Sequence, residues 1–194
     1  MSDDRRFPRL VALACHDLRT PLATVHGFAR TLARLDLDDP APRFVDMIEQ
    51  ASGQIAELVD ELALVSRIES GRFEPKLETV DSLALVHEAA GELAPGTTDV
   101  RGKGALVGVE IDSTRRSLRQ LARAARRHGG LESVTVDVEG RELAVSPLAG
   151  TASAVVTGEE LRELGAAAAV ALIRALGGTV ESDGRRLLVR LPEP

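Results

Sequence analysis

The sequence predicts an α-helical hairpin followed by a mixed α/β domain, a fold of the class α + α/β. Two observations support this prediction. Apolar residues recur at helical spacing over the first seventy residues, on both sides of a short segment rich in acids and prolines. Beyond residue 100, short stretches of alternating apolar and polar residues are separated by helical stretches and by glycine turns. We expect the boundary near residue 75, which gives domains 1–75 and 76–194.

The first helix is predicted over residues 6–35. One apolar seam runs along it at a spacing of seven residues, and smaller apolar residues lie between its members, as expected of a helix with one buried face. The seam residues are Val11, Leu18, Val25 and Leu32, and those between them are Ala14, Leu22, Ala29 and Leu35.

A turn and a second helix follow. Residues 36–42 read Asp-Leu-Asp-Asp-Pro-Ala-Pro, and acids and prolines favour the start of a helix. The apolar residues of the second helix alternate steps of four and three, which is the spacing of a coiled-coil seam. We expect this helix to end at Ser70-Gly71, where glycine can close it. Its seam consists of Phe44, Ile48, Ala51, Ile55, Leu58, Leu62 and Val65.

Two antiparallel helices cannot bury both seams as an isolated pair. A second copy of the hairpin would complete a four-helix bundle, so we expect a homodimer. The alternative is that the seams pack against the C-terminal domain of the same chain.

The elements of the second domain follow from alternation and turn residues. The expected order is strand, helix, hairpin, helix and hairpin. Glycines at 129–130, 140, 177–178 and 184 mark the ends of helices and the turns of the hairpins. The expected elements are a strand over 105–111, a helix over 112–127, strands over 134–138 and 142–146, a helix over 159–176, and strands over 179–182 and 186–191.

Composition excludes several classes of partner. Aromatic residues make up only 2% of the chain, with no Trp or Tyr, and the net charge is −6. Both features disfavour binding to nucleic acid or to an anionic membrane. No apolar run is long enough to span a bilayer, and the acidic N-terminus is not a signal peptide. The single cysteine, Cys15, allows no internal disulfide. We therefore expect a soluble, cytoplasmic protein with no nucleic-acid and no membrane partner.

The most informative motif is His16-Asp17-Leu18-Arg19-Thr20-Pro21-Leu22 in the first helix. A carboxylate next to a histidine can hold one ring nitrogen as a donor and leave the other as a nucleophile. The run resembles the H-box of two-component histidine kinases, in which the histidine carries the phosphoryl group. The end of the second helix, residues 62–71, and the following stretch, residues 77–89, are similar to the same family.

This resemblance implies roles for particular residues. His16 is the candidate phosphoryl acceptor, and Asp17 orients and polarises its ring. Thr20 lies one turn from His16 and completes, with Asp17, the acid-x-x-Thr pattern linked to phosphatase activity in the family. The same face continues through the small residues Ala23 and Gly27. In the family it docks the receiver domain of a response regulator, which makes Arg19, Ala23 and Gly27 candidate partner-binding residues. The alternative is that Ala23 and Gly27 are merely exposed.

The second domain resembles the ATP-binding domain of histidine kinases, an α/β sandwich of the Bergerat type shared by GHKL ATPases. Its layout is retained, whereas the nucleotide-binding positions are not. Ala124 stands where the family has an asparagine that holds magnesium, and a methyl group cannot ligate a hard cation. Residues 145–150 offer no carboxylate for adenine, and Pro147 stiffens the loop. Residues 164–169 keep one glycine of a phosphate-binding turn, and the lid shrinks to residues 151–158.

We therefore expect a degenerate ATPase-like domain with no cofactor of its own; a partner receiver domain could bring magnesium. Six arginines make its first helix basic, which indicates either a solvated face, the interpretation we favour, or a patch for an acidic partner. These arginines are Arg115, Arg116, Arg119, Arg123, Arg126 and Arg127.

Three functions are compatible with the sequence. The first is a histidine phosphotransferase, a phosphorelay component that exchanges a phosphoryl group between His16 and receiver aspartates, with or without phosphatase activity. The second is a divergent ATP-dependent sensor histidine kinase. The third is a non-catalytic dimeric scaffold that binds a regulator.

Overall fold

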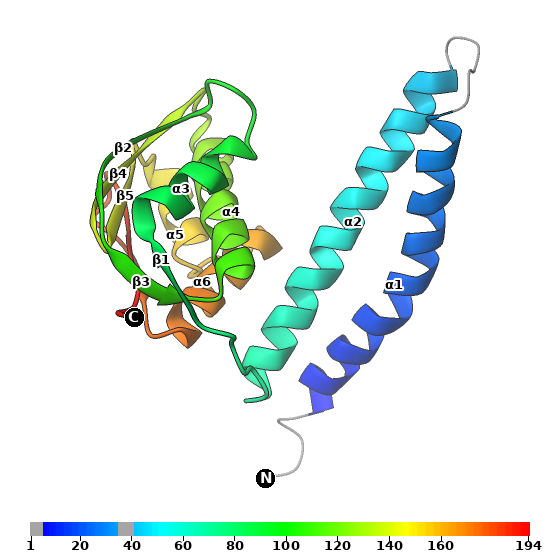
Figure 1. Cartoon of the computed structure of the whole chain (residues 1–194), viewed down its shortest axis with the longest axis horizontal. Coiled ribbons are helices and arrows are strands. Elements are labelled where there is room, and N and C mark those ends of the chain that lie inside the picture. The colour runs from blue at the N-terminus through cyan, green and yellow to red at the C-terminus, as the bar shows by residue number, and fades with distance from the viewer. Residues whose placement is uncertain (1–5, 35–40) are drawn as a thin grey trace. The chain divides into compact units, whose positions relative to one another are not determined.

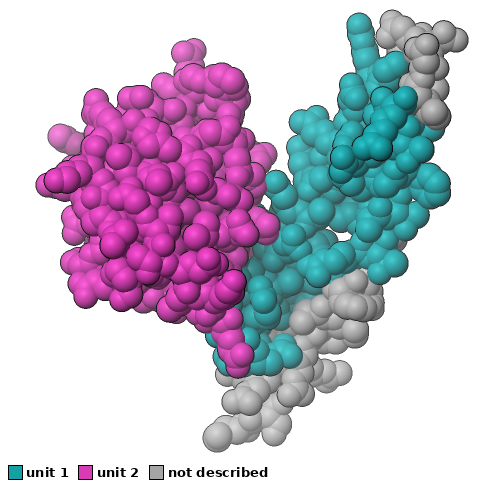
Figure 2. Space-filling view, viewed as in Figure 1, with its two compact units in different colours: residues 1–73 teal, residues 74–194 magenta. Residues whose placement is uncertain are grey.

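The chain folds into two compact units, residues 1–73 and 74–194, which are coloured separately in Figure 2. The computed structural model describes the backbone of residues 6–34 and 41–194. For residues 6–10, 12–14, 16, 17, 21 and 41 it describes the backbone alone. The expected turn at 36–40 and the seam residue Leu35 lie outside the described residues. The fold class predicted from the sequence is confirmed, with a helical unit followed by an α/β unit.

The first unit is a hairpin of two long antiparallel helices, α1 (Arg6–Leu32) and α2 (Ala41–Glu69) (Figure 1). Two ion pairs fix their register. Arg19 pairs with Asp60 at 2.5 Å, and Arg30 pairs with Glu49 at 3.6 Å. The distance in sequence from Arg19 to Arg30 in α1 equals that from Glu49 to Asp60 in α2. The partners follow in opposite order along the two helices, as an antiparallel arrangement requires.

Among the described side chains, the interior of the hairpin is built mainly from small and medium-sized residues, and most of the predicted seam residues lie outside it. Seven seam residues are between 41% and 58% exposed in the single chain: Leu18, Val25, Leu32, Phe44, Ile48, Ile55 and Leu58. The buried apolar residues of the hairpin are instead Cys15, Leu22, Ala29, Val45 and Val59. The hairpin therefore leaves a long apolar surface uncovered.

Helix α2 ends next to Gly71, as the sequence predicts. Gly71 adopts a φ of +65°, the amide of Gly71 donates to the Ile68 carbonyl, and the amide of Arg72 donates to that of Arg67. These two hydrogen bonds form a Schellman motif, in which a glycine in the left-handed conformation satisfies the last carbonyls of a helix.

The second unit is built on a five-stranded mixed sheet in the order β2-β4-β5-β7-β6. Strand β2 runs parallel to β4, and the other neighbours are antiparallel. A separate antiparallel pair is formed by β1 (Glu78–Asp81) and β3 (Leu106–Val109). The strands of the main sheet are β2 (Thr98–Gly104), β4 (Val134–Gly140), β5 (Glu142–Ser146), β6 (Thr179–Ser182) and β7 (Leu187–Arg190).

All helices of this unit lie on one face of the sheet (Figure 1). They bury valines, leucines and alanines against the inward-facing residues of the strands, so one apolar core joins the two layers. The opposite face carries many charged residues, among them Asp137, Glu139, Glu142 and Arg190. The helices are α3 (Ser82–Gly91), α4 (Ile111–Gly129), α5 (Gly150–Val156) and α6 (Leu164–Ala175).

Two predictions about the elements were wrong. The strand expected over 105–111 is shorter, since β3 spans only Leu106–Val109 and α4 begins at Ile111, and the preceding strand β2 was not predicted. Strand β2 carries two glycines and alternates weakly, so its sequence gives little strand signal. The helix expected over 159–176 begins only at Leu164, and the segment expected to be a lid contains helix α5. Helix α5 is short and rich in β-branched residues, so it depends on packing rather than on helix propensity.

Candidate functional site

The residues of the H-box lie in the first half of α1. His16 and Asp17 are part of the helix, and their side chains lie outside the described ones. Thr20, Ala23 and Gly27 follow on α1, and all three are exposed. Residues three or four apart share a face of a helix. The exposed residues therefore continue the face on which His16 stands.

Arg19 is held by the second helix. Its guanidinium donates to the carboxylate of Asp60, and both side chains remain partly exposed. Beneath this pair, Cys15 is 2% exposed, and burial raises the pKa of its thiol. The H-box is therefore anchored to α2 by a charged pair at the surface and by a neutral thiol in the interior.

A groove opens between α1 and α2 next to Arg19. It has a volume of about 280 Å³ and a mainly apolar lining. Its walls include the small residues Ala23, Gly53 and Ala56, and the Arg19–Asp60 pair lies at its border. Gly53 has no heavy atom of another segment within 4 Å of where a Cβ would lie, so the groove is open at that point.

One wall of this groove belongs to the face predicted from the sequence, and the other does not. Arg19 and Ala23 line the groove as part of the predicted face, whereas Gly27 does not. His26 is half-buried and also lines the groove. Gly53, Ala56 and Asp60 come from α2 and were not predicted. Gly53 and Ala56, two small residues three positions apart in a coiled-coil helix, were the available signal for this wall. Whether they face α1 depends on the register of the hairpin, which the sequence does not give.

The basic helix α4 is partly neutralised by its neighbours. Arg115 contacts Glu88, Glu92 and Asp112, and Arg119 pairs with Glu92 at 2.7 Å. The acids of α3 thus bind the first part of the arginine row. These ion pairs agree with the interpretation of the first part of α4 as a solvated face, on which the charged ends of the arginine side chains meet water and neighbouring acids.

The position aligned with the magnesium-binding asparagine is closed. Ala124 is 0% exposed, and so is its neighbour Ala125. Helix α4 packs directly on α6, whose Ala166 and Ala169 are also buried. Methyl groups on both helices fill the contact and present no oxygen to a cation. The residues at this position therefore do not fit a magnesium–triphosphate group.

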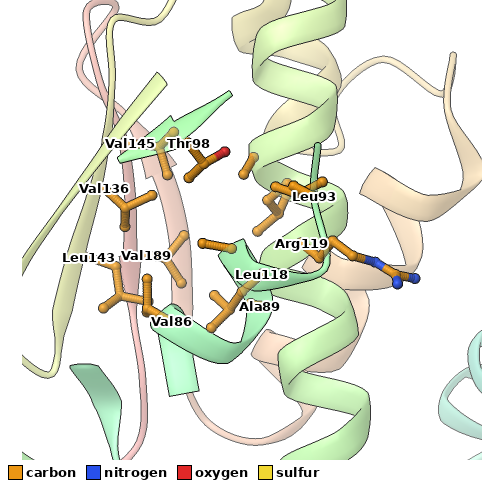
Figure 3. A pocket seen from close by; sticks show the side chains of 13 residues that line it. Val86, Ala89, Leu93, Thr98, Leu118, Arg119, Val136, Leu143, Val145 and Val189 are labelled. Carbon is orange, nitrogen blue, oxygen red and sulfur yellow. The ribbon is translucent and has the colours of Figure 1, made fainter. Parts of the chain in front are cut away.

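Two hollows of this unit differ in size and in lining. A cavity of about 20 Å³ lies between α3, α4 and the sheet, and Figure 3 shows its valine, leucine and alanine lining, with the Arg119 guanidinium pointing away. Its volume corresponds to about one water molecule. A larger hollow of about 530 Å³ covers the outer face of the sheet. Its charged lining is mixed, with the arginines Arg186 and Arg190 beside four carboxylates: Asp137, Glu139, Glu142 and Glu181.

Within residues 6–34 and 41–194, no helix combines the length and apolar character that crossing a membrane requires. Among the described side chains, no cluster of histidine, cysteine and acidic residues could hold a metal ion.

Comparison with known proteins identifies the first unit. Residues 9–71 match the model of the His Kinase A (phospho-acceptor) domain. The histidine protein kinase DivJ of Caulobacter vibrioides is 31% identical over 121 residues, which are 58% of this chain and 20% of that protein. The sensor histidine kinase TrcS of Mycobacterium tuberculosis is 35% identical over 97 residues, 48% of this chain and 19% of that protein. The chain spans about a fifth of the length of these relatives.

Two solved structures share the fold of both units. Full-length ShkA, in complex with AMPPNP, aligns with a TM-score of 0.66 at 22% identity. The alignment covers 94% of this chain and 44% of the ShkA chain. The Acinetobacter baumannii histidine kinase AdeS aligns with a TM-score of 0.58 at 18% identity. This alignment covers 91% of this chain and 97% of the AdeS chain. Residues 9–71 therefore form a domain of the His Kinase A (phospho-acceptor) family, and the fold of both units is that of solved histidine kinases.

Proposed function

We propose that this protein is a histidine phosphotransferase, which accepts a phosphoryl group at His16 from a receiver aspartate and donates it to another without using ATP itself. The observation that carries the proposal is the combination of a phospho-acceptor domain with a second unit whose magnesium position is the buried methyl group of Ala124. The first supplies the acceptor, and the second leaves the protein dependent on an external phosphoryl donor.

The transfer breaks one bond and forms one. A ring nitrogen of His16 attacks the phosphorus of the receiver's aspartyl phosphate, an N–P bond forms, and the P–O bond to the aspartate breaks. The electron pair stays on the released carboxylate. Asp17 would hold the proton on the other ring nitrogen and stabilise the positive charge that develops on the ring. Magnesium bound by the receiver would neutralise the transferring group. The reverse sequence passes the phosphoryl group to the next receiver.

The groove between α1 and α2 supports docking of the receiver beside His16. Its walls of Ala23, Gly53 and Ala56 allow close approach of a partner helix, which in-line attack requires. Arg19 at the border can meet an acid of the partner while remaining paired with Asp60. Gly27 would extend the contact along the exposed face of α1.

The exposed seams support a homodimer. Seven large apolar side chains along both helices are about half exposed in one chain, and a second hairpin would cover them in a four-helix bundle. A monomeric soluble protein rarely exposes an apolar stripe of this length.

A second activity at the same site is removal of the phosphoryl group. The hydroxyl of Thr20, one turn from His16, could position a water molecule to attack the acyl phosphate of a docked receiver. The exposed position of Thr20 supports this role. Thr20→Ala should then retain transfer to His16 and lose most of the accelerated dephosphorylation. Equal loss of both activities would contradict a separate role for Thr20.

The test of the main proposal uses the receiver domains of the source organism, each phosphorylated with acetyl phosphate. The purified full-length chain should remove the phosphoryl group from a cognate receiver in the absence of ATP and acquire an acid-labile phosphohistidine. His16→Ala should still bind that receiver and acquire no label. His87→Ala is the matched control, because His87 is exposed on α3 of the other unit and should transfer normally.

The same assay separates the competing functions. Label acquired from ATP and magnesium, and absent in His16→Ala, would identify an autokinase. Normal binding and regulation of the receiver by His16→Ala, with no label on the wild-type protein, would identify a scaffold. Either result would refute the proposed phosphotransferase.

A further inference from the structure

Two ion pairs bridge α1 and α2 on the side of the hairpin where the groove opens. Arg19 pairs with Asp60 at the border of the groove, and Arg30 pairs with Glu49 at 3.6 Å. Arg30 follows Arg19 by eleven positions in α1, and Asp60 follows Glu49 by eleven positions in α2. Eleven residues make about three helical turns, or about 16 Å of helix, so the second pair lies on the same side as the first.

The groove occupies the interval between the two pairs. Ala23 and His26 line it from α1, and Gly53 and Ala56 line it from α2. Each of these residues stands between the two charged positions of its own helix. A mainly apolar hollow of about 280 Å³ is therefore bordered by one ion pair, and a second ion pair follows beyond its other end.

The charges are divided between the two walls. In both pairs the arginine belongs to α1 and the acid belongs to α2. The α1 wall is thus positive at both ends, and the α2 wall is negative at both ends. This pattern is complementary to one kind of helix, which has acids along one edge, bases along the other edge and apolar side chains between them.

The charged side chains of both pairs are accessible to a partner. They are between 35% and 59% exposed, and ion pairs with this exposure contribute little to the stability of a fold. A partner can therefore place its own charges beside them without opening the hairpin. The distance between Arg30 and Glu49 is longer than a hydrogen bond, so both groups keep bonding capacity for that partner.

We propose that the groove and its two ion pairs select the receiver domain by charge. They bind a receiver helix of at least three turns, with acids on the edge that faces α1, bases on the edge that faces α2 and apolar side chains between the two edges. A helix with the opposite arrangement would bring like charges together at both ends, and its receiver would be rejected. The Arg30–Glu49 pair is then a specificity determinant. The inference rests on the docking step of the proposed function and adds the charge pattern of the partner.

The test measures, by fluorescence anisotropy, the binding of the labelled receiver domain from the source organism that binds the wild-type chain most tightly. Arg30→Glu combined with Glu49→Arg keeps an ion pair and leaves the groove lining unchanged, but it reverses the charge of both walls at one end. The dissociation constant should rise about tenfold or more. Added salt should weaken binding to this variant less than binding to the wild type, because attraction at one end is now opposed by repulsion at the other.

Arg101→Asp combined with Asp137→Arg is the matched control, because this exposed ion pair joins β2 to β4 in the other unit. It should bind the receiver as the wild type does. A second hairpin variant, Arg30→Gln combined with Glu49→Gln, removes both charges without reversing them. Its affinity should lie between those of the wild type and the exchanged variant, and it tests the same point where thermal unfolding shows that the exchange destabilises the hairpin.

Two results would overturn the inference. One is a folded exchanged variant that binds the receiver with the affinity and salt dependence of the wild type. The other is an equal loss of binding in the Arg101–Asp137 control, because the effect would then not belong to the groove. Failure of the proposed function is seen separately. A wild-type chain that binds the receiver and acquires no phosphoryl group at His16 refutes the phosphotransferase, whereas the loss of binding on exchange still decides the charge pattern.

Discussion

Arg19 of α1 and Asp60 of α2 form an ion pair that connects the H-box to the second helix of the hairpin. Arg19 lies one turn beyond His16, and Asp60 lines the groove in which we expect a receiver to dock. The pair is therefore placed to set the distance between the phosphoryl acceptor and the opposite wall of that groove.

Exchanging the two charges separates a structural role from a partner-binding role. Arg19→Asp combined with Asp60→Arg should restore the hairpin stability that either single change removes, an effect of about 0.2–1 kcal/mol because both side chains are substantially exposed. Receiver binding should remain weakened, because the positive charge has moved from α1 to α2. Thermal unfolding and receiver binding measure the two effects. Full recovery of binding would show that Arg19 acts only within the hairpin.

The exposed seam of α2 should hold the dimer together. Ile55→Asp places a charge in the middle of the apolar surface, so it should shift the protein from dimer to monomer in sedimentation experiments. Gln54→Asp adds the same charge at the neighbouring exposed position and should leave the dimer intact. A wild-type chain that sediments as a monomer would contradict the four-helix bundle.

Gly27 offers a change that should stabilise the hairpin and weaken docking. No heavy atom of another segment lies within 4 Å of the position that its Cβ would take, so Gly27→Ala fits without strain. Alanine in a helix interior should raise the free energy of unfolding by about 0.5–1 kcal/mol. If a receiver contacts this face, its affinity should fall at the same time. Unchanged affinity in the stabilised variant would remove Gly27 from the docking surface.

Cys15 should react slowly with thiol reagents. Its side chain is buried, and because burial raises its pKa, less of the reactive thiolate is present at neutral pH than for an exposed cysteine. Alkylation of the folded protein should therefore be much slower than that of the unfolded chain, and it should accelerate when the hairpin opens. Rapid alkylation of the native protein would contradict the burial of this residue between α1 and α2.

Much of the fold could be predicted because local signals agree with tertiary structure. Helix α2 was predicted from apolar residues that alternate steps of four and three, and its end was predicted from Gly71. Strands β5 and β6 were predicted with the bounds that the structure has, because both alternate cleanly beside a turn. Strand β2 was missed because an edge strand with two glycines lacks such alternation.

The candidate site could be predicted on one helix only. The H-box and Ala23 are visible along α1, whereas Gly53, Ala56 and Asp60 join them through the register of the hairpin. The roles of His16, Asp17 and Thr20 remain predictions.

A calorimetric titration of ATP and magnesium into the purified chain tests most directly whether the protein acts, as we propose, without a nucleotide of its own. No binding heat is expected up to millimolar nucleotide, because Ala124 offers no ligand for magnesium. Binding with a micromolar dissociation constant would contradict the account and would identify a nucleotide-dependent histidine kinase.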